Sequence, residues 1–284
     1  MLVPFGLALL AVFAPAAPEE NATGDASGNR LFLWSYDRLA IIDLAEPAQL
    51  VNEWNLGDSV RDISGVASSK SILLFGYPPD EQLPCLYALS RLDSAVERVA
   101  CGRILAISVD DESETAFLLE RQERDPNITQ VMAVDLQAKP QRVAFHCRVE
   151  LAASSLSVAN QGERIVLGSG GFLLDFDRRS GNLVRLTEGT SPSLSPDGSR
   201  LAFLQDGSLY IYDFKKRTVQ CILNRRFWQR RLVGPVSWSP TGELLSVSAP
   251  TGIAGKRLRC LIVSESGEVA TSFESGAKWC GPWE

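Results

Sequence analysis

The only histidine of the chain is His146, and a catalytic arrangement of the Ser-His-Asp or Cys-His type would have to use it. It stands in the segment VAFHCR, whose composition is that of a β-strand. The sequence contains no G-x-S-x-G nucleophile elbow, no G-x-x-x-x-G-K phosphate loop and no H-E-x-x-H metal motif. We therefore expect a structural histidine, no enzyme activity, no cofactor and no resident metal.

The most distinctive local feature is an arginine-rich segment with two aromatic residues, RRFWQRR, at residues 225–231. Arginine and tryptophan are enriched in the hot spots of protein interfaces, because both offer a large area and directional contacts. This composition predicts a protein-binding patch that consists of Arg225, Arg226, Trp228, Arg230 and Arg231. The alternative is a solvated loop whose arginines pair with nearby carboxylates while Trp228 is buried between structural units.

The elements that would position these residues are short strands in a repeat. The stretch Ser191–Phe214 contains two turn signals, Pro196-Asp197-Gly198 and Asp206-Gly207, between apolar runs. Its turn glycine Gly198 has counterparts in Gly162 and Gly242, at intervals of 36 and 44 residues. Weaker copies are centred near residues 70 and 112. A period of about 40 residues with four strands per copy is typical of propeller blades.

The repeat motif resembles that of a known family. The pattern apolar-Ser-x-Ser-Pro-Asp-Gly-x-x-apolar-Ala-Phe, matched best by Ser193–Phe203, is similar to the TolB-like, WD-like propeller repeat, although the WD dipeptide is absent. The same repeat occurs in the propeller domains of prolyl-oligopeptidase-type peptidases, whose catalytic triad lies in a separate hydrolase domain. Because no residues remain here for such a domain, the resemblance implies the fold and leaves that activity unsupported.

The copies predict an all-β fold: a six-bladed β-propeller of four-stranded antiparallel blades over residues 30–284. The first unit lacks an inner strand, and Ala277–Trp283 (AKWCGPW) echoes the inner-strand pattern of Val236–Pro240 (VSWSP). We expect this C-terminal strand to complete the N-terminal blade, because closure removes the open sheet edges. His146 would then lie on the outermost strand of the third blade.

This topology predicts a loop-rich face that carries residues 225–231, opposite the turns that contain the repeat glycines. Lys215-Lys216-Arg217 would be a solvated turn on that opposite face. A second candidate site is the mouth of the central channel, where carboxylates could hold a cation such as calcium and support a lactonase- or glycosidase-like propeller enzyme. The residues expected there are Asp58, Asp62, Glu150, Glu188 and Glu274, with Arg103 and Arg231 nearby.

The N-terminal sequence indicates where the protein acts, and the net charge limits the classes of partner that it can bind. Residues 1–16 contain an apolar run and a small-residue cleavage site, which predict a signal peptide, and residues 17–29 predict a flexible leader. We expect a secreted or periplasmic protein with no stable membrane insertion after cleavage of the signal. A net charge of −6 argues against nucleic acid as a partner. A protein partner is expected, and a small ligand is possible.

Six cysteines in a secreted chain allow disulfides. Cys85 and Cys101 flank a hairpin whose turn lies at Leu92–Ala95, so they would face each other across neighbouring strands. We predict a Cys85–Cys101 disulfide. The remaining four fall on separate predicted strands, where we expect buried thiols; they are Cys147, Cys221, Cys260 and Cys280.

Overall fold

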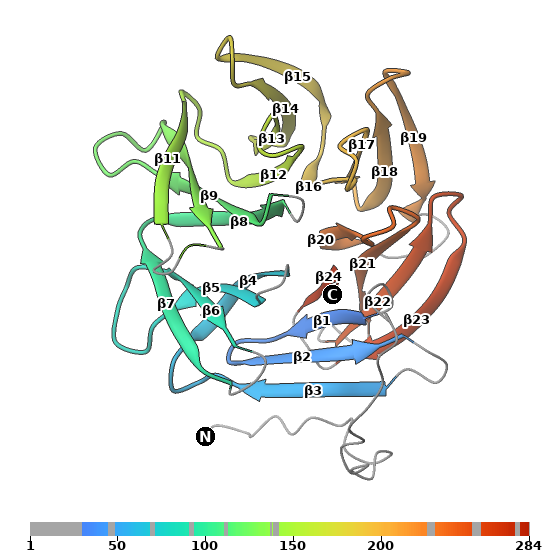
Figure 1. Ribbon diagram of the computed structural model, residues 1–284. Coiled ribbons are helices and arrows are strands. Elements are labelled where there is room, and N and C mark those ends of the chain that lie inside the picture. Colours follow the sequence, from blue (N-terminus) through green and yellow to red (C-terminus); the bar gives the residue numbers. More distant parts are fainter. Residues whose placement is uncertain are drawn as a thin grey trace.

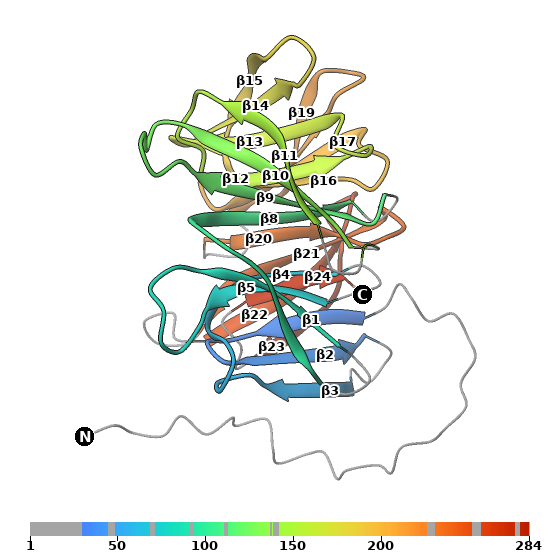
Figure 2. The ribbon, with the colours of Figure 1, turned by 60° about the vertical axis from the view of Figure 1, so that its left-hand side comes forward.

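The computed structural model is a ring of six β-sheets around a central channel (Figure 1, with a second view in Figure 2). The structure describes residues 30–44, 49–68, 72–90, 94–110, 113–136, 138, 142–225, 231–251, 257–275 and 279–283. The predicted signal peptide (1–16) and leader (17–29) lie outside these residues, so they stay predictions. Within these ranges, no helix has the length and apolar character needed to cross a membrane.

Blades 1 to 3 combine the first eleven strands with the last one. From the innermost strand outward, blade 1 contains β24 (Trp279–Trp283), β1 (Arg30–Trp34), β2 (Arg38–Asp43) and β3 (Gln49–Asn55); blade 2 contains β4 (Arg61–Ser68), β5 (Ile72–Tyr77), β6 (Cys85–Leu89) and β7 (Val96–Cys101); blade 3 contains β8 (Ile104–Asp110), β9 (Thr115–Arg121), β10 (Thr129–Asp135) and β11 (Arg142–Val149).

Blades 4 to 6 follow in chain order. Blade 4 contains β12 (Ser155–Ala159), β13 (Arg164–Ser169), β14 (Phe172–Asp177) and β15 (Asn182–Glu188); blade 5 contains β16 (Thr190–Leu194), β17 (Arg200–Gln205), β18 (Ser208–Asp213) and β19 (Thr218–Leu223); blade 6 contains β20 (Val233–Trp238), β21 (Leu244–Thr251), β22 (Arg257–Ser264) and β23 (Val269–Ser275). The predicted fold class and blade count are confirmed.

The ring closes as predicted, through a strand from the C-terminus. β24 pairs antiparallel with β1, with Leu33 opposite Cys280 and Leu31 opposite Trp283. The Trp283 side chain is 4% exposed and its Nε1 donates to the carbonyl oxygen of Ser237, 3.2 Å away in blade 6. The chain terminus therefore joins the first and last blades by packing and by a hydrogen bond.

The apolar core is divided among the junctions between blades. The described residues form six clusters of buried side chains, and each cluster combines side chains of two neighbouring blades. The second strand of a blade contributes to both sides, so β13 and β17 each contain four consecutive buried residues. In β13, for example, Val166 packs toward blade 5 and Leu167 toward blade 3. This explains why the second strands are continuous apolar runs.

The repeat turns add polar contacts between blades. Gly198 has a φ of +65°, and a Cβ there would overlap Asn160 of blade 4. Arg164 Nη1 donates to the Gly198 carbonyl at 3.1 Å, and Arg200 Nη2 repeats this contact to Gly242 at 3.3 Å in the next blade. These turns therefore need glycine for its conformation and arginine for the contact between blades.

Asp197 stabilises the turn that contains Gly198. Burial raises the pKa of Asp197, but hydrogen bonds from the Ser195 and Ser199 hydroxyls, both at 2.6 Å, outweigh this effect and bring the pKa to about 2. The carboxylate therefore stays ionised in the folded turn, where the Ser199 N–H also donates to it.

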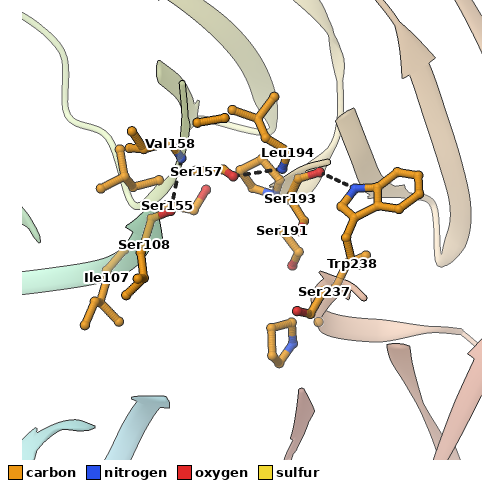
Figure 3. A pocket seen from close by; sticks show the side chains of 18 of the residues that line it. Ile107, Ser108, Ser155, Ser157, Val158, Ser191, Ser193, Leu194, Ser237 and Trp238 are labelled. Atoms are coloured by element: carbon orange, nitrogen blue, oxygen red, sulfur yellow. Dashed lines mark hydrogen bonds between the residues drawn. The ribbon is translucent and has the colours of Figure 1, made fainter. Parts of the chain in front are cut away.

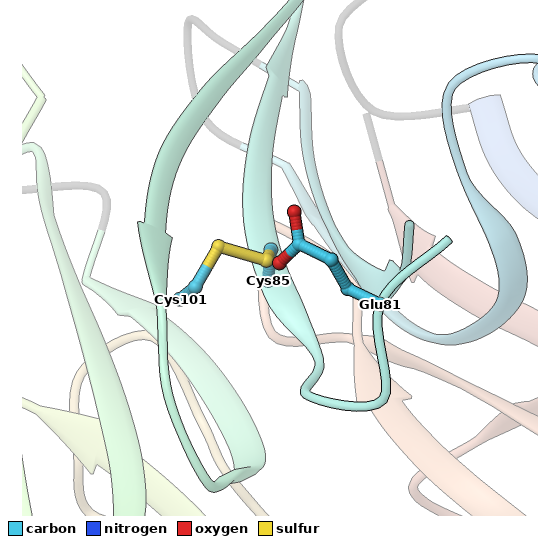
Figure 4. Close-up of side chains that lie close together, drawn as sticks. All are labelled: Glu81, Cys85 and Cys101. Carbon is cyan, nitrogen blue, oxygen red and sulfur yellow. A yellow bond between two sulfur atoms is a disulfide. The ribbon is translucent and has the colours of Figure 1, made fainter. Parts of the chain in front are cut away.

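The predicted disulfide is present. Cys85 and Cys101 are opposite each other in the β6–β7 ladder and are joined, with Cα atoms 4.0 Å apart (Figure 4). Cys147 and Cys260 are both buried; Cys147 is a free thiol, and burial raises its pKa to about 11. The expectation of a buried thiol is wrong for Cys221, which is exposed because β19 is an outermost strand with one face at the rim.

We predict that Trp283→Ala lowers the free energy of unfolding by about 3 kcal/mol, because it removes a buried aromatic from the closing junction. Trp283→Phe, which loses the hydrogen bond but keeps most of the packing, should cost about 1 kcal/mol. Denaturant unfolding followed by circular dichroism measures both. If Trp283→Ala unfolds like the wild type, β24 does not contribute to the stability of the ring.

We predict that the disulfide contributes about 3 kcal/mol, since it closes a loop of 16 residues and restricts the unfolded chain. The Cys85→Ala/Cys101→Ala variant should melt at a lower temperature than the oxidised wild type and should not respond to reductant. Cys221→Ser is the control and should melt like the wild type. A wild-type melting temperature unchanged by full reduction would contradict this assignment.

Candidate functional site

The two ends of the arginine-rich segment are anchored to one hairpin turn. The turn between β17 and β18 is Asp206-Gly207, on the face opposite Gly198. The N–H of Arg225 donates to Ser208 Oγ at 2.9 Å, and the N–H of Leu232 donates to the Gly207 carbonyl at 2.9 Å. The segment therefore emerges from a fixed place on the loop-rich face. Arg226, Trp228 and Arg230 lie outside the described residues.

Arg225 and Arg231, the described members of the predicted patch, are both exposed. Arg225 Nη1 lies 3.5 Å from the Asp206 carbonyl oxygen. A Cβ on Gly207, whose φ is +75°, would overlap Arg231, so the turn packs tightly beneath that residue. Neither arginine forms an ion pair with a carboxylate in the part of the chain that the structure describes.

His146 lies at the rim, as expected. It is on β11, the outermost strand of blade 3, and its ring packs edge-on against Phe117 with centroids 5.0 Å apart. Its Nε2 is 3.4 Å from the Gly162 carbonyl oxygen. Burial, aided by the charge of Arg178, lowers the pKa of His146. It does not line the channel, and its contacts are those of a structural residue.

None of the five carboxylates expected at the channel mouth is among the described residues that line the channel. Glu150, Glu188 and Glu274 lie at or beside the ends of outermost strands and pair with Arg148, Arg185 and Arg259. Asp58 and Asp62 are exposed, Asp62 lies on the inner strand β4, and Arg103 pairs with Glu123. The channel-mouth site stays a prediction.

Another group of potential metal ligands contains Glu81 and both disulfide cysteines (Figure 4). The sulfur atoms of Cys85 and Cys101 are bonded to each other, so neither cysteine is available as a thiolate ligand. Glu81 forms an ion pair with Arg98 at 2.7 Å. This cluster is therefore a disulfide beside an ion pair.

A cavity of about 570 Å³ occupies the central channel. It extends from the beginnings of the inner strands, at Ser155, Ser191 and Gly234, to their ends, at Asp110 and Pro240. At the loop-rich face, the inner strands β16 and β20 are irregular. Ser191 of β16 has a φ of +54°, and a Cβ on Gly234 of β20 would overlap the Ser191 hydroxyl. Bulged inner strands of this kind are common beside binding sites.

The two sides of the channel differ in chemistry. Among the described lining residues, seven of the eight serines come from blades 4 to 6; the eight are Ser108, Ser155, Ser157, Ser191, Ser193, Ser195, Ser237 and Ser239. The described lining from blades 1 to 3 is mostly apolar, and includes Trp34, Val66, Phe75, Leu105, Ile107 and Val109. In Figure 3, the Ser191 and Ser237 side chains point into the open space.

Some of these serines join neighbouring blades (Figure 3). The Ser108 hydroxyl accepts a hydrogen bond from the Val158 N–H at 3.0 Å, and the Ser157 hydroxyl accepts one from the Leu194 N–H at 2.8 Å. At the equivalent position of the next blade, the backbone carbonyl of Ser193 accepts from Trp238 Nε1 at 2.9 Å instead. The repeated serine of the motif is thus a contact between blades. Our sequence analysis missed this role, although the recurring serine was its signal.

Comparison with known proteins identifies the fold. No protein-family model matches the chain, and no curated protein matches it significantly in sequence. Among solved structures, TolB from Acinetobacter baumannii is 18% identical with a TM-score of 0.68, and the match covers 90% of this chain and 66% of that one. A putative TolB from Agrobacterium tumefaciens is 14% identical with a TM-score of 0.62, covering 86% and 88%.

A chain in the structure of a nidogen/laminin complex is also similar, at 9% identity and a TM-score of 0.61, covering 86% of this chain and 92% of that one. The protein has a TolB-like β-propeller fold. The predicted resemblance is confirmed at the level of the fold, while the specific repeat family remains a prediction because no family model matches.

We predict that Ser157→Ala destabilises the protein by about 1–3 kcal/mol, since it leaves the buried Leu194 N–H without an acceptor. Ser193→Ala is the matched control, at the same position of the next repeat. Its hydroxyl has no partner among the described residues, so its removal should change stability by less than about 0.5 kcal/mol. Equal effects of the two substitutions in denaturant unfolding would contradict the assigned roles.

Proposed function

We propose that this protein is a non-enzymatic protein-binding scaffold that acts outside the cytoplasm, either secreted or in the periplasm. The observation that carries the proposal is the arginine-rich segment at residues 225–231. Its two described arginines are exposed and lack carboxylate partners among the described residues, and both of its ends are anchored to the β17–β18 turn. Because both ends of the segment are anchored before a partner binds, the entropy cost of binding is reduced.

The chemistry of the segment favours an acidic protein surface as the partner. Four arginines with Phe227 and Trp228 combine positive charge with the aromatic area typical of interface hot spots. Complementary charge accelerates association and disfavours wrong partners. The binding residues that we propose are Arg225, Arg226, Trp228, Arg230 and Arg231.

The fold and the expected oxidising compartment are consistent with this role. One of the similar structures belongs to a nidogen/laminin complex, which is an assembly of proteins. The Cys85–Cys101 disulfide fits an oxidising compartment, as does the predicted signal peptide. The catalytic alternative has less support, because none of the carboxylates on which it rested is among the described residues that line the channel.

We predict that Arg225→Glu/Arg231→Glu lowers the capture of a protein partner about tenfold, because it reverses charge at the patch. Cross-linking and affinity capture from cells that produce the protein measure this. The control is Lys215→Glu/Arg217→Glu, which reverses two exposed charges on the opposite face. A near-stoichiometric partner should be recovered with the wild type and the control, and about tenfold less with the patch variant, as for a loss of binding energy near 1.4 kcal/mol.

The proposal is overturned if the patch variant is folded and captures the same partner as the wild type. It is also overturned if the wild type captures no near-stoichiometric protein. Weaker capture at higher salt should accompany the expected result, since the contacts are electrostatic.

A further inference from the structure

The central channel has the dimensions of a small-molecule site. Its volume of about 570 Å³ falls within the range of roughly 300–1,000 Å³ that ligand pockets occupy. It opens beside the irregular beginnings of β16 and β20, where Ser191 and Pro235 line it. The hydroxyls of Ser108 and Ser157 join neighbouring blades, but neither these contacts nor the proposed protein-binding patch uses the other lining hydroxyls described next.

The lining contains hydroxyl groups whose hydrogen-bonding capacity the protein leaves unused. The hydroxyls of four lining serines have no hydrogen-bond partner among the described residues; they are Ser155, Ser191, Ser193 and Ser237. A second kind of donor is also unused. Trp34 lines the apolar side at 2% exposure, and its Nε1 is buried without a partner in the described part of the chain. Buried donors of this kind normally have a partner, which a bound molecule can supply.

The charge of the described lining selects against anionic ligands. Asp110 is the one ionisable side chain among the described lining residues, and it is 7% exposed. Its carboxylate already accepts hydrogen bonds from Ser113 Oγ, at 3.1 Å, and from the Gln161 N–H. An anionic ligand would therefore lose its hydration and gain no counter-charge from these residues.

The opposite walls favour a molecule with two kinds of surface. Serine hydroxyls line the side of blades 4 to 6, and side chains such as Leu105 and Ile107 line the side of blade 3. A purely apolar ligand would remove the serine hydroxyls from water without replacing their hydrogen bonds. A sugar ring has hydroxyl groups around its edge and C–H groups on its face, so it matches both walls.

We propose that the central channel binds an uncharged sugar of one or two rings, with its hydroxyls on Ser191, Ser193 and Ser237 and a C–H face toward Ile107 and Leu105. This site lies inside the ring and does not depend on the arginine-rich segment. It is therefore a function beyond the proposed protein binding, and each proposal can fail without the other.

The test uses the full chain and a set of uncharged sugars: glucose, galactose, N-acetylglucosamine, maltose, cellobiose and lactose. Saturation-transfer NMR detects binding, and calorimetric titration measures affinity. At least one sugar should bind saturably to the wild type. Glucuronate, which carries a negative charge on a similar ring, should bind about tenfold more weakly, because the described lining offers it no cationic side chain.

The variants Ser193→Leu and Ser237→Leu place side chains in the lumen and should each weaken sugar binding about tenfold or more. Ser272→Leu is the matched control: it makes the same change at an exposed position on the outermost strand β23 and should leave affinity unchanged. Because leucine could disturb the inner strands, Ser193→Val and Ser237→Val provide a smaller, β-branched replacement suited to a strand. Circular dichroism and melting temperature establish that each variant is folded.

Two results would overturn the proposal. One is the absence of saturable binding to the wild type for every uncharged sugar of the set. The other is sugar binding that folded lumen variants retain at wild-type affinity, which would place the sugar elsewhere on the molecule.

Discussion

Burial of both faces of every blade is the constraint on which this structure depends. A four-stranded sheet of this kind presents apolar side chains on both faces, as the four consecutive buried residues of β13 and β17 show. Each face is removed from water only if another blade covers it. In an open row of six blades the two outermost faces would stay exposed. Pairing of β24 with β1 places blade 1 against blade 6 and covers them both.

The polar contacts follow from the same constraint. Backbone groups at the ends of the inner strands are buried where blades meet, and a buried group without a partner is costly. The contacts from Arg164 and Arg200 to the turn carbonyls of the next blade satisfy such groups on one face. The serines of the inner strands do so within the ring. The residues of the repeat motif therefore form contacts between blades. The same residue types recur from copy to copy because of this packing more than because of a shared chemical activity.

This explains which features could be predicted from the sequence. Turn glycines and the continuous apolar second strands are local signals, so the period, the six blades and the closing strand followed from them. Cys85 and Cys101 could be paired because both belong to one hairpin. Placement of Glu150 and Glu188 could not be derived from the sequence because it required the ends of the outer strands to within a residue or two, and a shift of that size changes which surface a side chain meets. Exposure of Cys221 depends on its place in an outermost strand, which composition does not encode.

The channel shows how repeats that are equivalent in sequence acquire different roles. Ser157 and Ser193 occupy the same repeat position, yet only the Ser157 hydroxyl bonds to the next blade. The difference comes from the residue that follows the serine in the neighbouring blade. Where that residue is Leu194, the blades are joined by its N–H and the serine hydroxyl. Where it is Trp238, its indole N–H reaches the Ser193 carbonyl instead. Trp283 bonds to the Ser237 carbonyl in the same way. Tryptophan thus takes over the contact between blades at two successive junctions, and the serine hydroxyls there are released from a structural role. A propeller can in this way alter the lining of its channel without losing the contacts that hold its ring together.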